Sequence, residues 1–434
     1  MGRDVGKTVV QKILSRAAGR DLTIGETVWV EPDLMVMHDR NAARYLRVVN
    51  RIGAKVRNPE KLAIVYDHKV PCGDAAGIID HVYLKAEMTN HGITRVYLPG
   101  DHGISHQLVV DKGLAQPGSL VLASDTHTNT IGGIGALAIP ISSGMAAMLV
   151  LGKHWLMVPE TIQIRFEGQL APGVMGRDVG LAIIDMLGRK ADYKVLEFTG
   201  PGAAMLDIDQ RLTICNMSIE VGAKAAIFDA PYEGEVPAQY ASVSREGYVT
   251  SDPDAVFAQK ITVDLSDLQP LIAGPPRPEV ALPLSTFEGK PVTQVYIGSC
   301  AGGRIEDIRA AAKVMKGRHI AEGMRCFIVP SSTDIYKAAL REGLIETVVS
   351  AGAVVLASSC GPCFGYQAPL GDSDVCIATA TRNEPGRMGS ASAEIYLANA
   401  ATCAASAITG RITDARKVLD NNQNGYDSHT SKGA

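Results

Sequence analysis

The chain has few cysteines, few aromatic residues and little net charge. Its 434 residues include 8 Cys, 5% aromatic residues and a formal net charge of -4. So low a density of cysteines argues against a disulfide framework, and the N-terminal residues lack a signal-peptide pattern, so we expect a reducing, cytoplasmic setting. The charge leaves no basic footprint for nucleic acid. These absences favour a small molecule or another protein as the partner.

A membrane span is also not expected. The uncharged run 131–152 is long enough to cross a bilayer, but it contains five glycines and Pro140. We therefore predict a Gly-rich loop that leads into a buried helix, and no membrane partner.

Short apolar runs alternate with helical patterns along the chain, which predicts α/β layers on largely parallel sheets. The predicted strands are 62–66, 119–123, 292–297, 325–329, 353–357 and 374–379. Loops after parallel strands collect functional groups. Here these loops begin with Asp67-His68, Ser124 to His127, Ser299-Cys300, Ser359-Cys360 and Thr381-Arg382. The sequence therefore predicts a site at the strand ends.

Three cysteines follow such strands, Cys300 alone and Cys360 with Cys363 in a Cys-x-x-Cys pair. Three thiolates suit an iron–sulfur cluster with one open iron, although a Cys-x-x-Cys pair also fits zinc, a redox pair or packed thiols. Zinc needs a fourth ligand, and none flanks these motifs. A redox pair usually opens a thioredoxin-like unit. The other cysteines are predicted to be inert core thiols: Cys72, Cys215, Cys326, Cys376 and Cys403.

Several histidines stand near carboxylates. The acid–base candidates are His68 beside Asp67, His106, His127 beside Asp125, and Glu220. One histidine beside an acid is more often structural, but several near strand ends favour proton transfer and substrate binding. Two arginines, Arg382 and Arg387 in "TRNEPGRMG", suit bidentate recognition of a carboxylate, the alternative being solvated loop charges.

Taken in order, these segments resemble the aconitase superfamily, most closely the short large subunits of 3-isopropylmalate dehydratase and related hydro-lyases. The resemblance covers residues 5–418 and rests on "ISHQ", "SDTHTNTIGGIGALA", "TICNMSIEVGAKA", "IGSCAGGRIEDIRAAAKVMKG", "CGPC", "TRNEPGRMGS" and "AASAITGRITD". Several separate motifs in one order are far more specific than any single motif.

The resemblance implies three α/β/α domains of the aconitase large-subunit type around a central cluster site. We place them at 1–158, 159–285 and 286–419, with the Pro-rich stretch 274–291 as a connection and 420–434 as a flexible tail. It also implies a [4Fe-4S] cluster on Cys300, Cys360 and Cys363, with one iron that has no cysteine ligand and acts as a Lewis acid.

The resemblance further implies roles for the polar residues. Asp67 would pair with His68, Asp125 with His106, and Glu220 with His127. Thr126 and Asn216 would lie near the substrate, and Arg382 and Arg387 would hold a carboxylate or the loop that does so.

One part of the full-length family pattern is not found in the sequence. The Gly-Ser-Ser-Arg-like motif of the swivel domain, which supplies a serine base, has no counterpart here. The resemblance therefore implies a separate small swivel-domain subunit and a heteromeric enzyme.

Departures from the pattern leave the substrate open. Thr126 replaces a serine, Ala301-Gly302 replaces Thr-Asn, and Thr381 replaces an asparagine. The first hypothesis is a 3-isopropylmalate dehydratase of leucine biosynthesis. The alternatives are a paralogue such as homoaconitase or a methylated-malate hydratase, or a non-enzymatic scaffold or binding protein with a degenerate cluster site.

Overall fold

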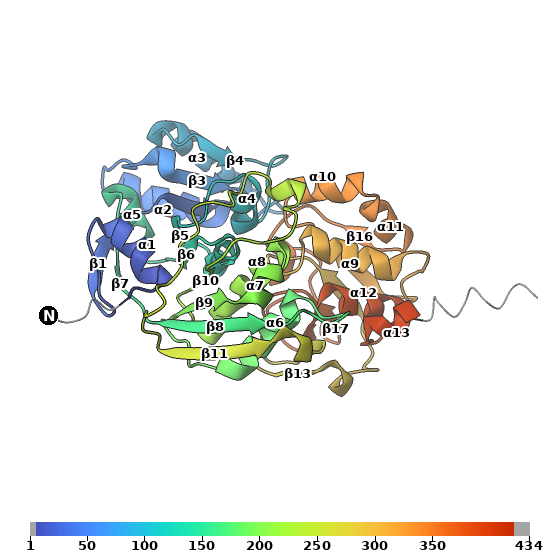
Figure 1. Cartoon of the computed structure of the whole chain (residues 1–434). Coiled ribbons are helices and arrows are strands. Elements are labelled where there is room, and N and C mark those ends of the chain that lie inside the picture. The colour runs from blue at the N-terminus through green and yellow to red at the C-terminus, as the bar shows by residue number, and fades with distance from the viewer. Residues whose placement is uncertain (1–5, 421–434) are drawn as a thin grey trace, which may run out of the picture.

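The computed structural model describes residues 6–420, and within that range the strands form three main sheets and one small ribbon (Figure 1). The first sheet, drawn in blue and teal, has five parallel strands in the order β4-β3-β2-β5-β6. They are β2 (Leu34–His38), β3 (Leu62–Val65), β4 (Arg95–Tyr97), β5 (Leu120–Ala123) and β6 (Leu137–Pro140). The ribbon pairs β1 (Thr27–Val30) antiparallel with β7 (His154–Met157).

Helices surround the first sheet. They are α1 (Val9–Ala18), α2 (Asp39–Arg51), α3 (Ala75–His91), α4 (Ser105–Asp111) and α5 (Met145–Leu151), with the 3-10 segment η2 (Thr126–Ile134) after β5. The run 131–152 was predicted as a loop before a helix, but it also contains strand β6. Its glycines permit close packing, since a Cβ on Gly132 would lie 1.8 Å from the Ala226 carbonyl oxygen. Among the described residues no helix has the length and apolar character required to cross a bilayer.

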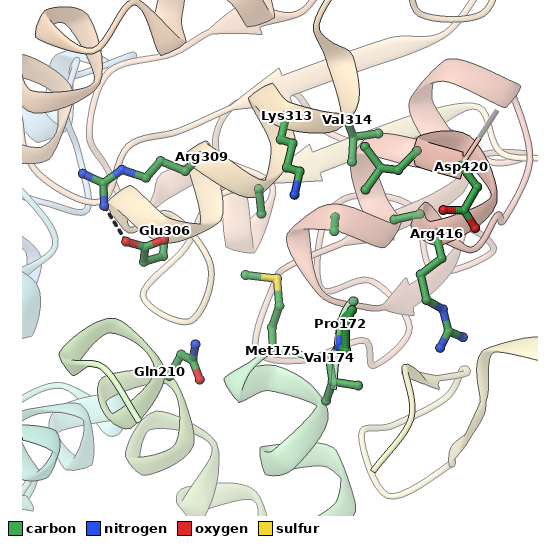
Figure 2. A pocket seen from close by; sticks show the side chains of 15 residues that line it. Pro172, Val174, Met175, Gln210, Glu306, Arg309, Lys313, Val314, Arg416 and Asp420 are labelled. Atoms are coloured by element: carbon green, nitrogen blue, oxygen red, sulfur yellow. Dashed lines mark hydrogen bonds and ion pairs between the residues drawn. The ribbon is translucent and has the colours of Figure 1, made fainter. Parts of the chain in front are cut away.

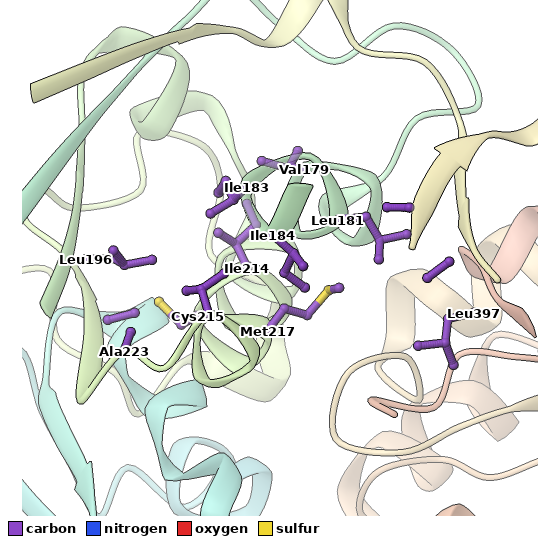
Figure 3. Packing of buried hydrophobic residues seen from close by; sticks show 14 of the residues in the cluster. Val179, Leu181, Ile183, Ile184, Leu196, Ile214, Cys215, Met217, Ala223 and Leu397 are labelled. Carbon is purple, nitrogen blue, oxygen red and sulfur yellow. The ribbon is translucent and has the colours of Figure 1, made fainter. Parts of the chain in front are cut away.

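The second sheet has four parallel strands in the order β10-β9-β8-β11. They are β8 (Thr161–Glu167), β9 (Val195–Thr199), β10 (Ala225–Phe228) and β11 (Gln259–Asp264), accompanied by helices α6 (Gly176–Leu187), α7 (Pro201–Met205) and α8 (Ile208–Met217). Figure 3 shows Ile184 of α6 beside Ile214 and Met217 of α8, with Val179 in the same buried cluster. Each such buried aliphatic side chain stabilises the fold by about 1.5–3 kcal/mol.

The third sheet has seven strands in the order β13-β12-β18-β17-β14-β15-β16, and its pairings are parallel except that β12 is antiparallel to both β13 and β18. They are β12 (Leu271–Ala273), β13 (Ala281–Pro283), β14 (Gln294–Ile297), β15 (Arg325–Ile328), β16 (Val354–Val355), β17 (Val375–Ala378) and β18 (Glu394–Leu397). The accompanying helices are α9 (Ile305–Met315), α10 (Thr333–Arg341), α11 (Leu344–Ser350), α12 (Ala400–Thr409) and α13 (Ala415–Asp420).

Helix starts follow local side-chain chemistry. Asp74, Asp207, Ser332 and Asn399 each precede a helix and accept a hydrogen bond from the amide three residues later. Such caps satisfy backbone donors that have no partner inside the helix, and each stabilises its helix by about 1 kcal/mol.

The predicted α/β class with parallel sheets is confirmed, and every predicted strand range contains an observed strand. The prediction for 274–291 was incomplete, because β13 lies in this stretch and pairs with β12 at the edge of the third sheet. The three domain boundaries remain a prediction. Apart from Asp420, the predicted tail 420–434 lies outside the described residues.

Candidate active site

The turn after β3 carries an aspartate and a histidine in direct contact. Asp67 Oδ1 lies 2.5 Å from His68 Nδ1, and Asp67 Oδ2 accepts a hydrogen bond from the Ser105 amide at 2.8 Å. Both side chains are buried. Asp67 therefore fixes the ring of His68, whose Nε2 lies 3.8 Å from Asp125 Oδ2.

Asp125, at the end of β5, lies between three imidazoles. Besides His68, its carboxylate is 3.8 Å from His106 Nδ1 and 3.9 Å from His127 Nδ1. Burial opposes ionisation, but His106 and His127 outweigh it and hold the pKa of Asp125 far below its usual range. Asp125 is therefore the shared anion of the histidine cluster.

His106 differs from the other histidines of this cluster. Burial lowers its pKa to about 4, so the ring is neutral near pH 7. Neither ring nitrogen has a hydrogen-bond partner within residues 6–420. The distance of 3.8 Å between His106 Nδ1 and Asp125 Oδ1 is too long for a hydrogen bond. The two predicted partners are therefore close to each other but not directly bonded.

A second chain of contacts runs through Glu220, in the 3-10 turn η3 (Ser218–Val221). His127 Nε2 lies 3.3 Å from Glu220 Oε1, and Arg382 Nε donates to both carboxylate oxygens at 2.9 and 3.0 Å. Although burial opposes this, His127 and Arg382 lower the pKa of Glu220. The carboxylate is therefore charged and already paired.

Cys300 follows a turn of unusual backbone conformation. Ser299 has a φ of +74°, in a region that non-glycine residues seldom adopt. The Ser299 hydroxyl donates to the Thr379 carbonyl at 2.7 Å and accepts from the Ala301 amide at 3.1 Å. The carbonyl of Cys300 accepts a hydrogen bond from the buried guanidinium of Arg304. These bonds hold the turn in its strained form.

The Cys-x-x-Cys loop lies against the Asp67 turn. The Cys360 amide and the Ser359 hydroxyl both donate to the Asp67 carbonyl, at 2.9 and 2.8 Å. Cys363 Sγ lies 3.9 Å from Thr381 Oγ1, at the end of β17. The cysteine loop therefore contacts both the first and the third sheets.

The three thiols lie close enough to affect one another. Burial, then the Cys363 sulfur, raises the pKa of Cys300 to about 12, and the same two causes raise that of Cys360 well above its usual value. All three cysteines are free. Cys300 and Cys363 are buried and Cys360 is half-buried. Thiols that repel one another as thiolates suit a cationic metal group, which would neutralise their charge.

Polar groups surround these sulfurs. For Arg387, burial lowers the pKa, but the Cys363 and Cys360 sulfurs outweigh it and raise the value. Asn216 Nδ2 donates to Thr130 Oγ1 at 2.8 Å, and the Asn216 side chain acts against the rise in the pKa of Cys300. Thr126 is exposed between Asp125 and His127. The structure thus brings the predicted site residues together.

Sequence reasoning missed several residues around the Asp67–His68 turn. The ring of His38 stacks on that of His68 at 3.8 Å between centroids, and Asn41 Nδ2 lies 2.8 Å from His38 Nε2. Asp39 and His81 are in contact at 3.1 Å. The signal was available, because the apolar run of β2 ends in His38-Asp39 just as other strands end in functional groups.

His38, Asp39, Asp67 and His68 also place possible metal-ligand atoms within 4.8 Å of one another. However, both oxygens of Asp39 accept N–H hydrogen bonds from the turn 67–69 or from His81. Hydrogen bonding explains this group without a cation.

A cavity of about 680 Å³ lies elsewhere, where Lys313 and Met175 face each other (Figure 2). Its lining comes from the segment 172–175 before α6 and from α8, α9, α12 and α13, and includes none of the predicted site residues. The polar groups needed for acid–base chemistry are at the cysteine site instead.

The Asp67–His68 pair predicts a pH-dependent contribution to stability. Burial lowers the pKa of His68, but Asp67 and Asp125 outweigh it and raise the value to about 9, above the ordinary 6.5. The stability that protonated His68 gains from these carboxylates is fully present below pH 6.5 and is lost as pH rises through about 9. The wild type should therefore melt at a higher temperature than His68→Gln, and this difference in melting temperature should be larger at pH 6 than at pH 10. The increase should be at least about 3 °C.

The matched control is His319→Gln, at an exposed histidine. The difference in melting temperature between this variant and the wild type should be the same at pH 6 and at pH 10. A constant difference for His68→Gln would contradict the expectation.

Comparison with known proteins gives a family match. A sequence model of the aconitase family (aconitate hydratase) matches residues 9–291 and 285–410. The 3-isopropylmalate dehydratase large subunit 1 of Methanopyrus kandleri is 37% identical over 420 residues, which is 96% of this chain and 100% of that protein. The 3-isopropylmalate dehydratase large subunit of Caldivirga maquilingensis is 40% identical over 422 residues, with the same coverage.

A solved structure shares the fold. Aconitase X of Thermococcus kodakaraensis, in its holo-form, superposes with a TM-score of 0.51 at 14% sequence identity. The match covers 86% of this chain and 89% of that one. It confirms the predicted type of α/β fold.

Proposed function

The chain belongs to the aconitase family and is the large subunit of a hydro-lyase, and from this we propose that it dehydrates and rehydrates 3-isopropylmalate. The observation that carries the proposal is the meeting of three free, mutually close cysteines with the Asp125-centred histidine cluster. The names of the relatives, each matched over its whole length, support the choice of substrate.

Family membership implies a [4Fe-4S] cluster. We propose that Cys300, Cys360 and Cys363 hold it and that one of its irons has no cysteine ligand. When bound, such a group supplies Lewis-acid polarisation of a leaving hydroxyl, an effect worth several kcal/mol. The fit rests on the crowded thiols, two of them buried (Cys300 and Cys363) and one half-buried (Cys360), whose charge a cationic group would neutralise.

The chain's own residues would handle protons and position the substrate. Asp67 and Asp125 keep a proton on His68 through neutral pH, which suits a donor toward a departing hydroxyl. Neutral His106 has two ring nitrogens available for the substrate. His127 is held by Glu220, which orients it.

The substrate carboxylates need cationic partners. We assign this role to Arg387, beside the cysteine sulfurs, and to Arg382, which Glu220 holds in place. Asn216 and Thr126 would complete the pocket through their polar groups. A planar guanidinium can bind a carboxylate with two parallel hydrogen bonds.

We also propose that a separate small subunit carrying a swivel domain supplies the base that removes the substrate proton. The relatives are named large subunits, which supports a small-subunit partner. No nucleic acid or membrane partner is proposed, and the setting would be the cytoplasm.

A related hydro-lyase acting on homocitrate or a methylated malate is the second candidate. The observation in its favour is Gly302, where the family pattern has an asparagine. A Cβ at this position would lie 2.3 Å from Thr379 Cβ, so the side chain of Thr379 takes the space beside the cysteine turn. Small changes of this kind alter which substrate a pocket accepts.

Turnover by the reconstituted complex tests the function. The chain, purified without oxygen, reloaded with iron and sulfide and mixed with its small subunit, should hydrate isopropylmaleate at saturable rates. The comparison substrates are the cis-unsaturated acids related to homocitrate and methylated malate. Absence of turnover with isopropylmaleate would reject the first substrate, and full activity of the large chain alone would reject the need for a partner.

A further inference from the structure

A buried carboxylate holds the backbone of the catalytic turn. Asp39, the first residue of α2, is 1% exposed. Its Oδ1 accepts hydrogen bonds from the amides of His68 at 3.0 Å and Asp67 at 3.4 Å, and its Oδ2 accepts one from Lys69 at 3.0 Å. Three consecutive amides therefore share one carboxylate.

His81, on α3, fixes this carboxylate from the other side. Its Nε2 lies 3.1 Å from Asp39 Oδ2, and His81 is the partner that contacts Asp39 from a different helix. Because the Asp39 oxygens have defined N–H partners on two sides, the carboxylate cannot rotate without losing hydrogen bonds.

Two further sets of contacts, ring stacking and hydrogen bonds, stabilise the turn that Asp39 holds. The ring of His68 lies between His38, at 3.8 Å, and Phe364, at 5.6 Å between ring centroids. Cys360 and Ser359 donate to the Asp67 carbonyl. Asp39 thus holds the amides of the turn, the 359–360 segment holds the Asp67 carbonyl, and His38 and Phe364 contact the His68 ring.

We propose that Asp39, supported by His81, is a positioning residue for His68 in the hydration reaction. This inference rests on the proposed function. Asp39 acts through the backbone, keeping His68 Nε2 at its 3.8 Å approach to Asp125. Loss of the shared carboxylate leaves three buried amides with weaker partners, so the turn shifts and the imidazole moves with it.

The main test is Asp39→Asn, which keeps the size of the side chain but replaces one acceptor oxygen with a donor. The kcat of the complex with the small subunit should fall about 100-fold while KM changes by less than about threefold. Iron content per chain should stay at the wild-type level. A crystal structure of the variant large subunit should place His68 Nε2 farther from Asp125 than in the wild type.

Variants at His81 should give smaller losses of kcat. His81→Ala should reduce kcat less than Asp39→Asn, and His81→Gln, which retains an N–H donor, should recover part of that loss. The control is Asp80→Asn, next to His81 on α3, where the carboxylate pairs with Arg47 at 2.7 Å near the surface. It should leave kcat unchanged.

Three results would overturn the proposal: a kcat of Asp39→Asn within about twofold of the wild type, a loss of iron in parallel with activity, or an unmoved His68 in the variant crystal. If the wild-type complex does not hydrate isopropylmaleate, the proposed substrate fails. The position of His68 in the two crystals still decides the role of Asp39 in that case.

Discussion

Replacement of Cys363 with serine is expected to remove the iron–sulfur group and reduce hydro-lyase activity at least about a thousandfold. Serine keeps the shape of the side chain, but its hydroxyl is a far poorer ligand for cluster iron than a thiolate. The loss of several kcal/mol of metal assistance corresponds to that factor in rate. Cys363 is 2% exposed, and its Sγ lies 3.9 Å from Thr381 Oγ1.

The measurements are iron and sulfide per chain after anaerobic purification, the visible absorption of the brown protein, and turnover with the small subunit. Cys376→Ala is the matched control, because Cys376 is buried in β17 but belongs to the predicted core thiols. It should keep about four irons per chain, as expected for a bound [4Fe-4S] group. Normal iron content in Cys363→Ser, or zinc in place of iron in the wild type, would contradict the assignment.

The second large effect is expected at Asp125. Asp125→Asn retains the oxygen that accepts the His127 amide at 2.7 Å, so the local turn should persist. It removes the charge that lies 3.8–3.9 Å from three imidazoles. His68 would lose part of the stabilisation of its protonated form, and its pKa would fall from about 9. We expect kcat to fall about a thousandfold, since acid–base catalysis contributes about 10²–10⁴.

The measurement is the pH profile of kcat for the complex, together with iron content. The alkaline limb should move to lower pH in Asp125→Asn, because the imidazole gives up its proton more readily. Asp101→Asn is the control, since Asp101 is an exposed residue paired with Lys112 at 2.7 Å. An unshifted profile with normal activity would mean that the charge of Asp125 has no part in proton transfer.

The sequence located the residues that meet at the candidate site, but it located the short edge strand of the third sheet less well. Strand ends such as Val65 before Asp67-His68, and Ile297 before Ser299-Cys300, combine an apolar run with polar or thiol groups, so local pattern was sufficient. Strand β13 was missed because its three residues lie among prolines, and its pairing with β12 depends on tertiary contacts.

His81 and Phe364, which lie near the His68 turn, could not be located by local pattern alone. His81 belongs to a helix whose sequence gives no sign of a contact with Asp39. The stack of His68 with Phe364 joins residues from opposite ends of the chain. Such contacts depend on how the sheets meet, and sequence spacing does not encode this.

The bond between the Cys360 amide and the Asp67 carbonyl has a consequence for the order of events during synthesis. The two residues are separated by most of the chain, and long-range contacts of this kind form late, after the cost of closing a large loop has been met. The three thiols therefore reach their common position only after residue 363 has been synthesised. The cluster proposed for these cysteines would therefore be inserted only after that point, because the nascent chain before it lacks the full set of proposed ligands.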